Sequence, residues 1–349
     1  MRAITILPGV AQSARLDEVE APAESGGSIL VRTRALGICG TDHEILSGLY
    51  GTAPRGDERL ILGHESLGVV EEAPAESGFR RGDHVVGIVR RPDPVPCPAC
   101  GSGEWDMCGN GLYTERGIKE LHGFGAEQFR IEPDFAVKAE PGLGLAAVLT
   151  EPASVVVKAW EHVFRIGRRS PSWTPATVLV TGAGPIGLLA ALIAAQHGLS
   201  VHVMDRHTQG PKPKLVRNLG GVHHDSTLSL GEMQFDVVME CTAASAVIAD
   251  AIARCAPSGI VCLVGVSSAG RKDEFDIGGF NRRLVLDNGV VFGTVNGNRR
   301  HYENAARALA KANRAWLDGL ISRRVPLSRW QDAFVTQPND IKVVIDFST

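Results

Sequence analysis

The chain lacks both a long apolar run and a strong charge of one sign. No apolar stretch reaches the roughly 20 residues that a membrane-spanning helix needs. The formal net charge of −3 leaves no overall electrostatic footprint for nucleic acid or for an anionic membrane. The first eight residues lack the long apolar core of a secretory signal peptide. These absences predict a cytoplasmic protein that binds neither nucleic acid nor membrane.

Cysteine is sparse, with seven residues in a chain of 349. In a reducing compartment such cysteines are more often metal ligands or buried thiols than disulfides. Glycine is abundant, with 40 residues, which predicts many turns and close backbone approaches. The length exceeds what one hydrophobic core usually supports, so two domains are expected.

Residues up to about 150 contain short alternating runs broken by Gly, Pro, Asp and Asn, which predict strands and turns. A strand expected over residues 29–36 gives way to a turn at residues 37–44. This turn carries Cys39 and other side chains that bind metal or move protons. Further on, His64-Glu65 interrupts an apolar strand, and burying this pair is unfavourable unless something satisfies it. These residues predict a metal site. The alternatives are that Cys39 is a buried thiol and His64 a partly exposed histidine, with no metal bound.

The spacing Cys97-x2-Cys100-x7-Cys108 gathers three of the seven cysteines within twelve residues. A Cys-x2-Cys turn directs two thiolates at one point, which suits a structural zinc ion. The nearest group able to serve as a fourth ligand is Asp93. Such a loop has few apolar residues, so the metal would supply its folding energy. The alternative is a proline-stiffened loop with incidental thiols.

A dinucleotide-binding motif stands in its required context. A strand over residues 177–181 is followed by Gly182, Gly184, Pro185, Ile186 and Gly187 in the pattern G-x-G-x-x-G, and then by a helix. The glycines allow the tight turn, the approach of pyrophosphate and the packing of helix on strand. The next strand, at residues 200–204, ends at Asp205, an acid placed to bind the ribose hydroxyls of NAD.

Strands expected over residues 235–240, 259–265 and 290–293 alternate with helices, which predicts a parallel sheet covered on both faces. A helix over residues 302–320 and a terminal strand over 342–347 follow, and this strand is expected to join the first domain's sheet. The predicted fold is α/β: a doubly wound Rossmann sheet plus an irregular β-barrel catalytic domain. The expected domains are 1–153 with 297–349 (catalytic) and 154–296 (dinucleotide-binding).

The β-rich part supplies Cys39, His64-Glu65 and Glu151, the last placed just before Pro152 at an expected helix start. A thiolate, a neutral imidazole and a carboxylate with one open position make a catalytic zinc site. Zinc in such a site lowers the pKa of a bound alcohol, so that a hydride can leave its carbon for nicotinamide. The two domains together therefore predict a zinc-dependent dehydrogenase.

Over nearly its whole length the chain resembles the zinc-dependent medium-chain alcohol and polyol dehydrogenases. Within them it is most similar to the glucose dehydrogenases of archaea and their bacterial relatives. One matching segment is the loop with Cys97, Cys100 and Cys108, called the cysteine lobe below. The others are residues 37–44, Gly63-His64-Glu65, 113–118, 121–123, 150–152, 182–187 and 293–296.

This resemblance implies that Cys39, His64 and Glu151 ligate the catalytic zinc, with Glu65 close by and able to exchange with water. It implies that Thr41 accepts the proton of the reacting hydroxyl and passes it toward His43 or Glu44. The side chains implied to hold sugar hydroxyls are Glu115, Glu151 and Asn296, and Asn296 is also placed at the cofactor.

Two features depart from the family pattern. The cysteine lobe of the family usually has four cysteines, and the first is missing here, where Pro94 occupies its expected position. Either Asp93 replaces it as the fourth ligand, or the lobe holds zinc weakly. Family members often use NADP. Here Asp205 would repel a 2′-phosphate while Arg206 could accept one, which favours NAD as the cofactor and leaves use of both NAD and NADP open.

Two alternatives stay open at this point: a related zinc-dependent polyol or alcohol dehydrogenase, and a non-catalytic dinucleotide-binding protein. The resemblance also implies a homodimer or homotetramer, with late strands such as residues 290–293 pairing across a two-fold axis.

Overall fold

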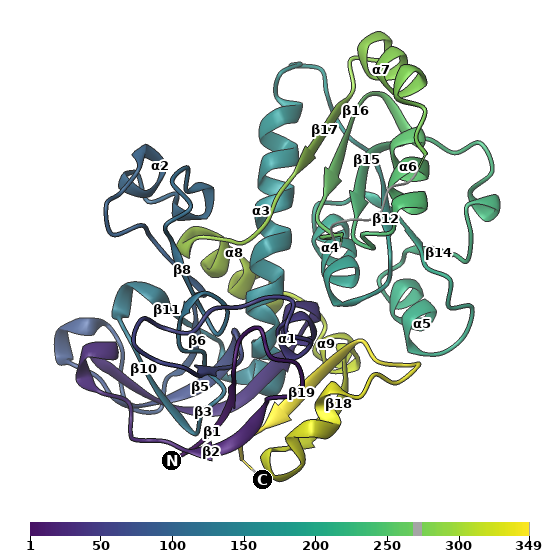
Figure 1. Ribbon diagram of the computed structural model, residues 1–349. Coiled ribbons are helices and arrows are strands. Elements are labelled where there is room, and N and C mark those ends of the chain that lie inside the picture. Colours follow the sequence, from purple (N-terminus) through teal and green to yellow (C-terminus); the bar gives the residue numbers. More distant parts are fainter. Residues whose placement is uncertain (268–273, 349) are drawn as a thin grey trace. The chain divides into compact units, whose positions relative to one another are not determined.

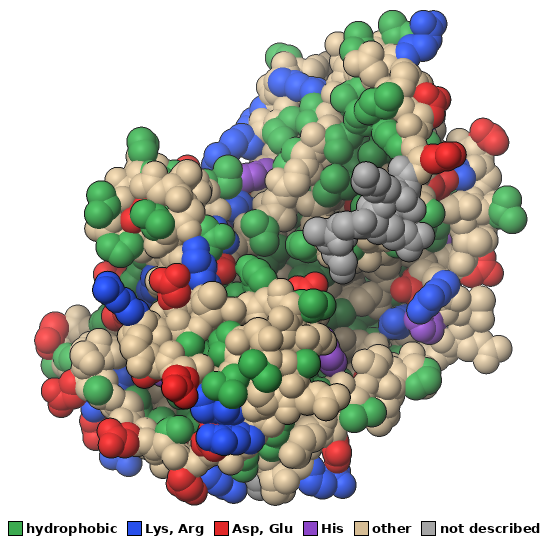
Figure 2. Space-filling view, viewed as in Figure 1, with side chains coloured by type: hydrophobic (Ala, Val, Ile, Leu, Met, Phe, Trp, Pro, Cys, Tyr) green, Lys and Arg blue, Asp and Glu red, His purple; other side chains and the backbone are tan. Residues whose placement is uncertain are grey.

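The structure is a computed structural model that describes residues 1–267 and 274–348. The chain divides into two compact units: unit 1 comprises Met1–Ser154 and Asn296–Thr349, and unit 2 comprises Val155–Val295. Both chain ends belong to unit 1 (Figure 1). Acidic and basic side chains are interspersed on the molecular face shown in Figure 2.

Unit 1 is built mainly from antiparallel strands in three sheets. The largest has the order β11-β6-β5-β3-β19-β18, with β10 also paired to β3. Its strands are β3 (Ile29–Ile38), β5 (Glu65–Glu72), β6 (His84–Gly87), β10 (Gln128–Ile131), β11 (Ala136–Lys138), β18 (Ile321–Pro326) and β19 (Lys342–Asp346). The small sheets contain β1 (Arg2–Ile6), β2 (Arg15–Glu18) and β4 (Leu60–Ile61), and β7 (Arg90–Arg91), β8 (Thr114–Arg116) and β9 (Glu120–Leu121).

Strand β3 is the centre of unit 1, because three other strands pair with it. One of its edges pairs with β5, and the other is shared by β10 near the start of β3 and by β19 near its end. The β19 pairing confirms that the terminal strand joins the first sheet. Apolar side chains from these strands, including Val31, Val70 and Ile345, form the core of the unit.

The helices of unit 1 are short. They are α1 (Gly40–Leu46), α2 (Pro98–Gly101), α8 (Arg299–Ala310), α9 (Arg314–Leu320) and the 3₁₀ helices η1 (Glu24–Gly26), η2 (Ala75–Ser77), η3 (Trp105–Met107), η4 (Pro133–Phe135), η5 (Pro141–Leu149) and η7 (Leu327–Phe334). Helix α3 (Thr150–Gly167) begins in unit 1 and continues into unit 2. The stretch Pro141–Gly167 is long and apolar enough to cross a membrane, but 67% of its apolar window is buried within the protein, as in core helices.

Unit 2 is a six-stranded parallel sheet with the order β14-β13-β12-β15-β16-β17. Its strands are β12 (Thr177–Thr181), β13 (Ser200–Met204), β14 (Val222–His224), β15 (Phe235–Glu240), β16 (Cys255–Leu263) and β17 (Val290–Gly293). Its helices are α4 (Pro185–Gln196), α5 (Pro211–Asn218), α6 (Ser245–Ala253), α7 (Ile277–Leu286) and η6 (Leu228–Leu230). Numbered within this unit, the order is 3-2-1-4-5-6, that of dinucleotide-binding Rossmann folds.

The structure corrects several predicted elements. Residues 37–44 do not form a turn, because β3 extends to Ile38 and Cys39 then caps helix α1. The single helix expected over residues 302–320 is two helices. Asn313 begins the second one by accepting a hydrogen bond from the backbone N–H of Trp316, a side-chain cap that competes with helix continuation.

Candidate active site

The first cluster of metal-binding groups lies where β3 and β5 pair. The register places Gly37 opposite Glu65, so the residues that follow Gly37 and precede Glu65 converge. Cys39 Sγ lies 3.0 Å from His64 Nε2. With a carboxylate oxygen of Glu65 these donor atoms lie within 4.8 Å of one another. Thiolate, imidazole and carboxylate at this separation are a donor set that fits Zn²⁺.

Behind this donor set lies Asp42, a buried acid in the first turn of α1. One carboxylate oxygen accepts a hydrogen bond from Cys39 N at 2.9 Å, and the other lies 3.4 Å from His64 Nδ1. An acid on the second ring nitrogen fixes the tautomer and orientation of a metal-binding histidine. The sequence places Asp42 in the motif but does not reveal this role, because His64 comes from a separate segment that immediately precedes β5.

The electrostatics of the cluster favour a cation at its centre. Burial by itself lowers the pKa of His64, but the charges of Cys39 and Asp42 outweigh it and raise this pKa well above the usual value. A cationic centre between a thiolate and a carboxylate is what a bound metal ion would supply. The residues present therefore fit zinc.

Glu65 is held by a buried lysine that sequence reasoning missed. Lys342 Nζ, on β19, donates to both Glu65 carboxylate oxygens at 2.6 Å and to Ile38 O at 3.0 Å. A Cβ at Gly37 would lie 2.1 Å from the Glu65 carboxylate, so this close approach requires glycine. A lysine at the start of a strand whose next three residues are apolar was the available signal, since a buried charge needs a partner.

Glu151 lies in the first turn of α3 and is buried. It is not part of the close group formed by Cys39, His64 and Glu65 among the described residues. Burial, the largest effect, raises its pKa to about 7, opposed by the charge of His64 and aided by that of Glu65. Glu151 thus belongs to the electrostatic surroundings of the cluster, and its role as a zinc ligand stays a prediction.

The predicted proton-transfer residues Thr41, His43 and Glu44 follow Cys39 on helix α1, and all three are partly exposed. The ring of His43 packs edge-on against Phe334 with centroids 5.8 Å apart. These positions keep His43 and Glu44 accessible to water, as a proton route requires. Their roles stay predictions.

Two of the predicted sugar-binding residues meet directly. Asn296 Nδ2 donates to Glu115 Oε1 at 2.7 Å, although the two lie 181 residues apart in sequence. Arg90, which the sequence did not single out, donates through Nε to the same oxygen at 3.0 Å and stacks over the Tyr113 ring. A buried carboxylate held in this way presents fixed acceptors to hydroxyl groups.

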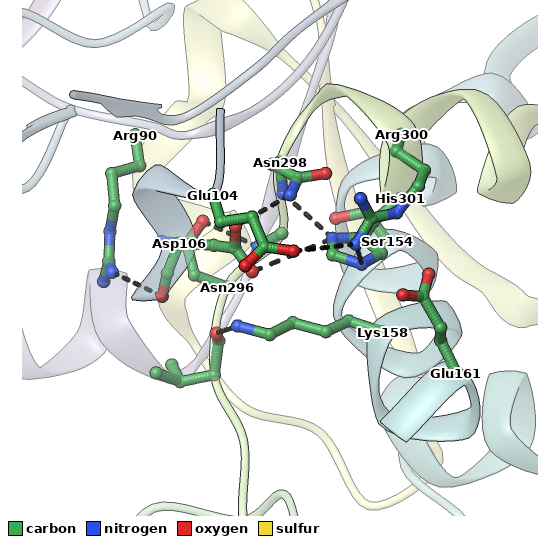
Figure 3. Close-up of polar contacts among 12 residues, drawn as sticks. Arg90, Glu104, Asp106, Ser154, Lys158, Glu161, Asn296, Asn298, Arg300 and His301 are labelled. Carbon is green, nitrogen blue, oxygen red and sulfur yellow. Dashed lines mark hydrogen bonds and ion pairs between the residues drawn. The ribbon is translucent and has the colours of Figure 1, made fainter. Parts of the chain in front are cut away.

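A second polar network fixes the segment that carries Asn296 (Figure 3). Asn298 Nδ2 donates to Asp106 Oδ1 at 2.8 Å, and Asn298 N donates to His301 Nδ1 at 3.1 Å. Arg90 donates to the backbone oxygen of Asp106. This network links the cysteine lobe to the start of α8, and sequence reasoning did not find it because its members are distant in the chain.

The cysteine lobe forms the second cluster. The sulfur atoms of Cys97, Cys100 and Cys108 lie within 4.8 Å of one another. Backbone N–H groups of Cys100 and Gly109 lower the pKa of Cys97 to about 6, whereas burial raises that of Cys100 to about 11. Three converging sulfur donors fit a structural zinc ion.

Asp93, the predicted fourth ligand, is buried in the same lobe but outside the three-sulfur group. Its carboxylate accepts hydrogen bonds from Val95 N at 2.8 Å and from Asn110 Nδ2 at 2.7 Å. A carboxylate has further acceptor sites. Ligation by Asp93 stays a prediction.

The predicted dinucleotide loop joins β12 to α4. A Cβ at Gly187 would lie 1.8 Å from Gly182 O, so only glycine lets the helix approach the strand. A Cβ at Gly184 would meet no atom within 4 Å, which leaves open space at the start of α4. Pro185 and Ile186 begin the helix, whose free N–H groups suit a phosphate. The loop fits a dinucleotide.

Comparisons with known proteins decide the family. Residues 145–347 match the family described as Glucose dehydrogenase C-terminus, and residues 25–141 match the Alcohol dehydrogenase GroES-like domain. The glucose 1-dehydrogenase of Methanocella arvoryzae is 39% identical over 99% of both chains. This chain belongs to the glucose dehydrogenase family of zinc-dependent medium-chain dehydrogenases.

Other family members agree. Glucose 1-dehydrogenase 1 of Caldivirga maquilingensis is 40% identical over 100% of this chain and 99% of its own. Glucose dehydrogenase of Haloferax mediterranei, solved in complex with NADP, Zn and gluconolactone, has a TM-score of 0.90 at 32% identity over 100% of both chains. The family resemblance and the predicted fold class, a Rossmann sheet with a separate catalytic domain, are confirmed.

Proposed function

We propose that this chain is a zinc-dependent oxidoreductase that transfers a hydride from C1 of a glucose-like aldose to NAD or NADP and yields the lactone. The observation that carries the proposal is the Cys39–His64 donor pair backed by Asp42, in a chain that shares its full length with glucose 1-dehydrogenases. The relative from Haloferax mediterranei binds NADP, Zn and gluconolactone, which is the product expected here.

Cys39 and His64 would hold the catalytic zinc, with Glu65 and Glu151 as the carboxylates available to complete or exchange the ligand set. Bound there, zinc would lower the pKa of the reacting hydroxyl, and the nicotinamide cofactor would accept the hydride. Asp42, with one carboxylate oxygen 3.4 Å from His64 Nδ1, would help to direct His64 Nε2 at the metal position. Lys342 compensates the buried charge of Glu65.

The sugar is recognised by paired polar groups. Arg90 holds the Glu115 carboxylate, and Asn296 presents an amide beside it, so acceptors and donors alternate at fixed positions. A desolvated hydroxyl needs such partners, and a substrate without it leaves them unpaired at a cost of about 1–3 kcal/mol each. Thr41 takes the hydroxyl proton and releases it through His43 or Glu44 toward water.

A panel of aldoses and linear polyols, assayed separately with NAD and NADP, tests the proposal. Glucose or a close epimer is expected to be oxidised and the linear polyols to be poor substrates. Activity on linear polyols alone would assign the chain to the polyol or alcohol dehydrogenases. Zinc and dinucleotide binding without turnover of any substrate would instead indicate a non-catalytic binding protein.

Assembly and location extend the proposal. Within the described residues, β17 pairs with β16 alone, and Ile277, Val285 and Leu286 on α7 are exposed. An open strand edge beside apolar side chains supports a homodimer or homotetramer formed through unit 2. Val285→Glu with Leu286→Glu is expected to yield monomers in sedimentation analysis, with zinc content unchanged. The cytoplasm is the proposed compartment, and fractionation of cells tests it.

A further inference from the structure

The acid at the end of β13 is not presented to solvent as a free carboxylate. Asp205 Oδ2 accepts a hydrogen bond from Ala183 N, in the glycine loop, at 2.8 Å. Asp205 Oδ1 accepts from His207 N at 2.9 Å and from the imidazole Nδ1 of His207 at 2.6 Å. The carboxylate therefore accepts three hydrogen bonds from unit 2, one from the glycine loop and two from His207.

This arrangement changes what Asp205 can offer to a nucleotide. A carboxylate has about four acceptor positions, and three of them are already used. The ribose of NAD carries two neighbouring hydroxyls, and an acid selects NAD by accepting hydrogen bonds from them and repelling a 2′-phosphate. With one acceptor position left, Asp205 cannot accept from both hydroxyls at full strength.

The charge of Asp205 is also compensated locally. Burial alone would raise its pKa, but the hydrogen bonds from Ala183 and His207 and the charge of Lys212 lower it. Lys212 Nζ lies 3.5 Å from His207 Nδ1, and Arg206, which lies between Asp205 and His207 in sequence, is exposed. Two cations thus stand beside an acid whose oxygens face the protein.

We propose that His207 is a specificity-determining residue for the cofactor. By holding Asp205 against the glycine loop, it withdraws the acid from the adenosine ribose and leaves Arg206 and Lys212 to meet a 2′-phosphate. The chain therefore accepts NADP at least as well as NAD. The inference rests on the proposed function, because it requires that unit 2 binds a nicotinamide dinucleotide.

The test uses two fragments that cannot react: 2′,5′-ADP, which carries the 2′-phosphate, and 5′-AMP, which does not. Their dissociation constants are measured by calorimetry on the full-length protein. The wild type is expected to bind 2′,5′-ADP about tenfold more tightly than 5′-AMP, a ratio typical of one charged contact pair. His207→Ala is expected to lower this ratio about tenfold, because the released carboxylate turns to the ribose and repels the phosphate.

Matched variants separate this effect from misfolding. His207→Asn retains a donor near the place of Nδ1 and is expected to keep the wild-type ratio. Lys214→Ala removes an exposed charge from α5, the helix that also carries Lys212, and is expected to leave the ratio unchanged. Asp205→Asn is expected to change the ratio less than about threefold, and Asp205→Asn with His207→Ala to restore the ratio lost in His207→Ala.

Contrary outcomes are distinguishable. If Asp205→Asn raised the ratio tenfold while His207→Ala left it unchanged, Asp205 would itself face the ribose and the role given to His207 would be wrong. If the wild type bound neither fragment, nor NAD or NADP, the proposed function would fail instead. A wild type that binds 5′-AMP more tightly than 2′,5′-ADP would overturn the cofactor preference alone.

Discussion

The two cysteine clusters of unit 1 are built in opposite ways. In the lobe, all three sulfur donors come from twelve consecutive residues, and backbone N–H groups of the same loop lower the pKa of Cys97. In the catalytic cluster, Cys39 follows β3 and His64 precedes β5, and the lysine that compensates Glu65 comes from 277 residues further along the chain. The lobe holds its donors by local geometry, and the catalytic cluster holds them by the sheet. A metal ion should therefore support folding in the cysteine lobe and chemistry in the catalytic cluster.

The largest expected effect is on catalysis at the sheet-held cluster. Cys39→Ser is expected to lower kcat/KM about 10³-fold or more, because metal-based charge stabilisation of several kcal/mol is lost. The melting temperature should fall little, since the sheet rather than the metal maintains this part of the fold. Steady-state kinetics, bound zinc and thermal melts are measured together. Cys255→Ala, a buried thiol of unit 2, is the control. Unchanged turnover with zinc still bound would contradict the proposed mechanism.

The lobe should respond in the reverse sense. Cys100→Ser is expected to remove one zinc per chain and to open the loop around residues 93–110, because the metal supplies the loop's folding energy. Hydrogen exchange by mass spectrometry should show the loss of protection there, while β3 and β5 stay protected. Asp93→Asn then tests the fourth ligand: loss of the same zinc supports ligation, and retention assigns Asp93 to bracing Val95 and Asn110. Loss of protection throughout unit 1 would refute the local role.

A smaller effect is expected on the affinity of the catalytic cluster for zinc, where Asp42 orients the His64 ligand from another part of the chain. Asp42→Asn weakens the acceptor behind His64 Nδ1, and the affinity for catalytic zinc is expected to fall about 10- to 100-fold. Competition with a chromogenic chelator measures it, and the lobe zinc should be unaffected. Asp17→Asn, a change at a paired acid elsewhere in unit 1, serves as the control. Equal weakening at both clusters would mean that Asp42 acts through overall stability.

The smallest effect concerns pH. Burial raises the pKa of Glu151 from 4.5 to about 7. Between these values the unfolded chain releases the proton while the folded chain keeps it, so the free energy of unfolding of the zinc-depleted protein should fall as pH rises. The expected fall is on the order of 1–3 kcal/mol, complete above about pH 7. Urea unfolding across this range measures it. Glu151→Gln should lack this fall in the free energy of unfolding, and Glu24→Gln, at an exposed site, should keep it. An identical pH dependence in the wild type and both variants would contradict the prediction.

The features predicted successfully from sequence are those set by neighbouring residues. Strands β12, β13 and β15 have the predicted bounds, because each is a short run rich in apolar and β-branched residues. The lobe cysteines converge as their spacing predicts. By contrast, Asn313 ends one helix and begins another through a single side-chain cap, which apolar periodicity does not register.

The sequence by itself determined the family, the two kinds of domain, the glycine loop and the three-cysteine lobe, because each depends on spacing within a short segment. Only the tertiary structure decided which partners meet across long separations. It joined His64 to Asp42, Glu65 to Lys342 and Glu115 to Asn296. It also turned Asp205 toward the glycine loop rather than leaving both oxygens for a ribose. The physical reason is that strand register and burial, not local spacing, determine which donor reaches a buried charge.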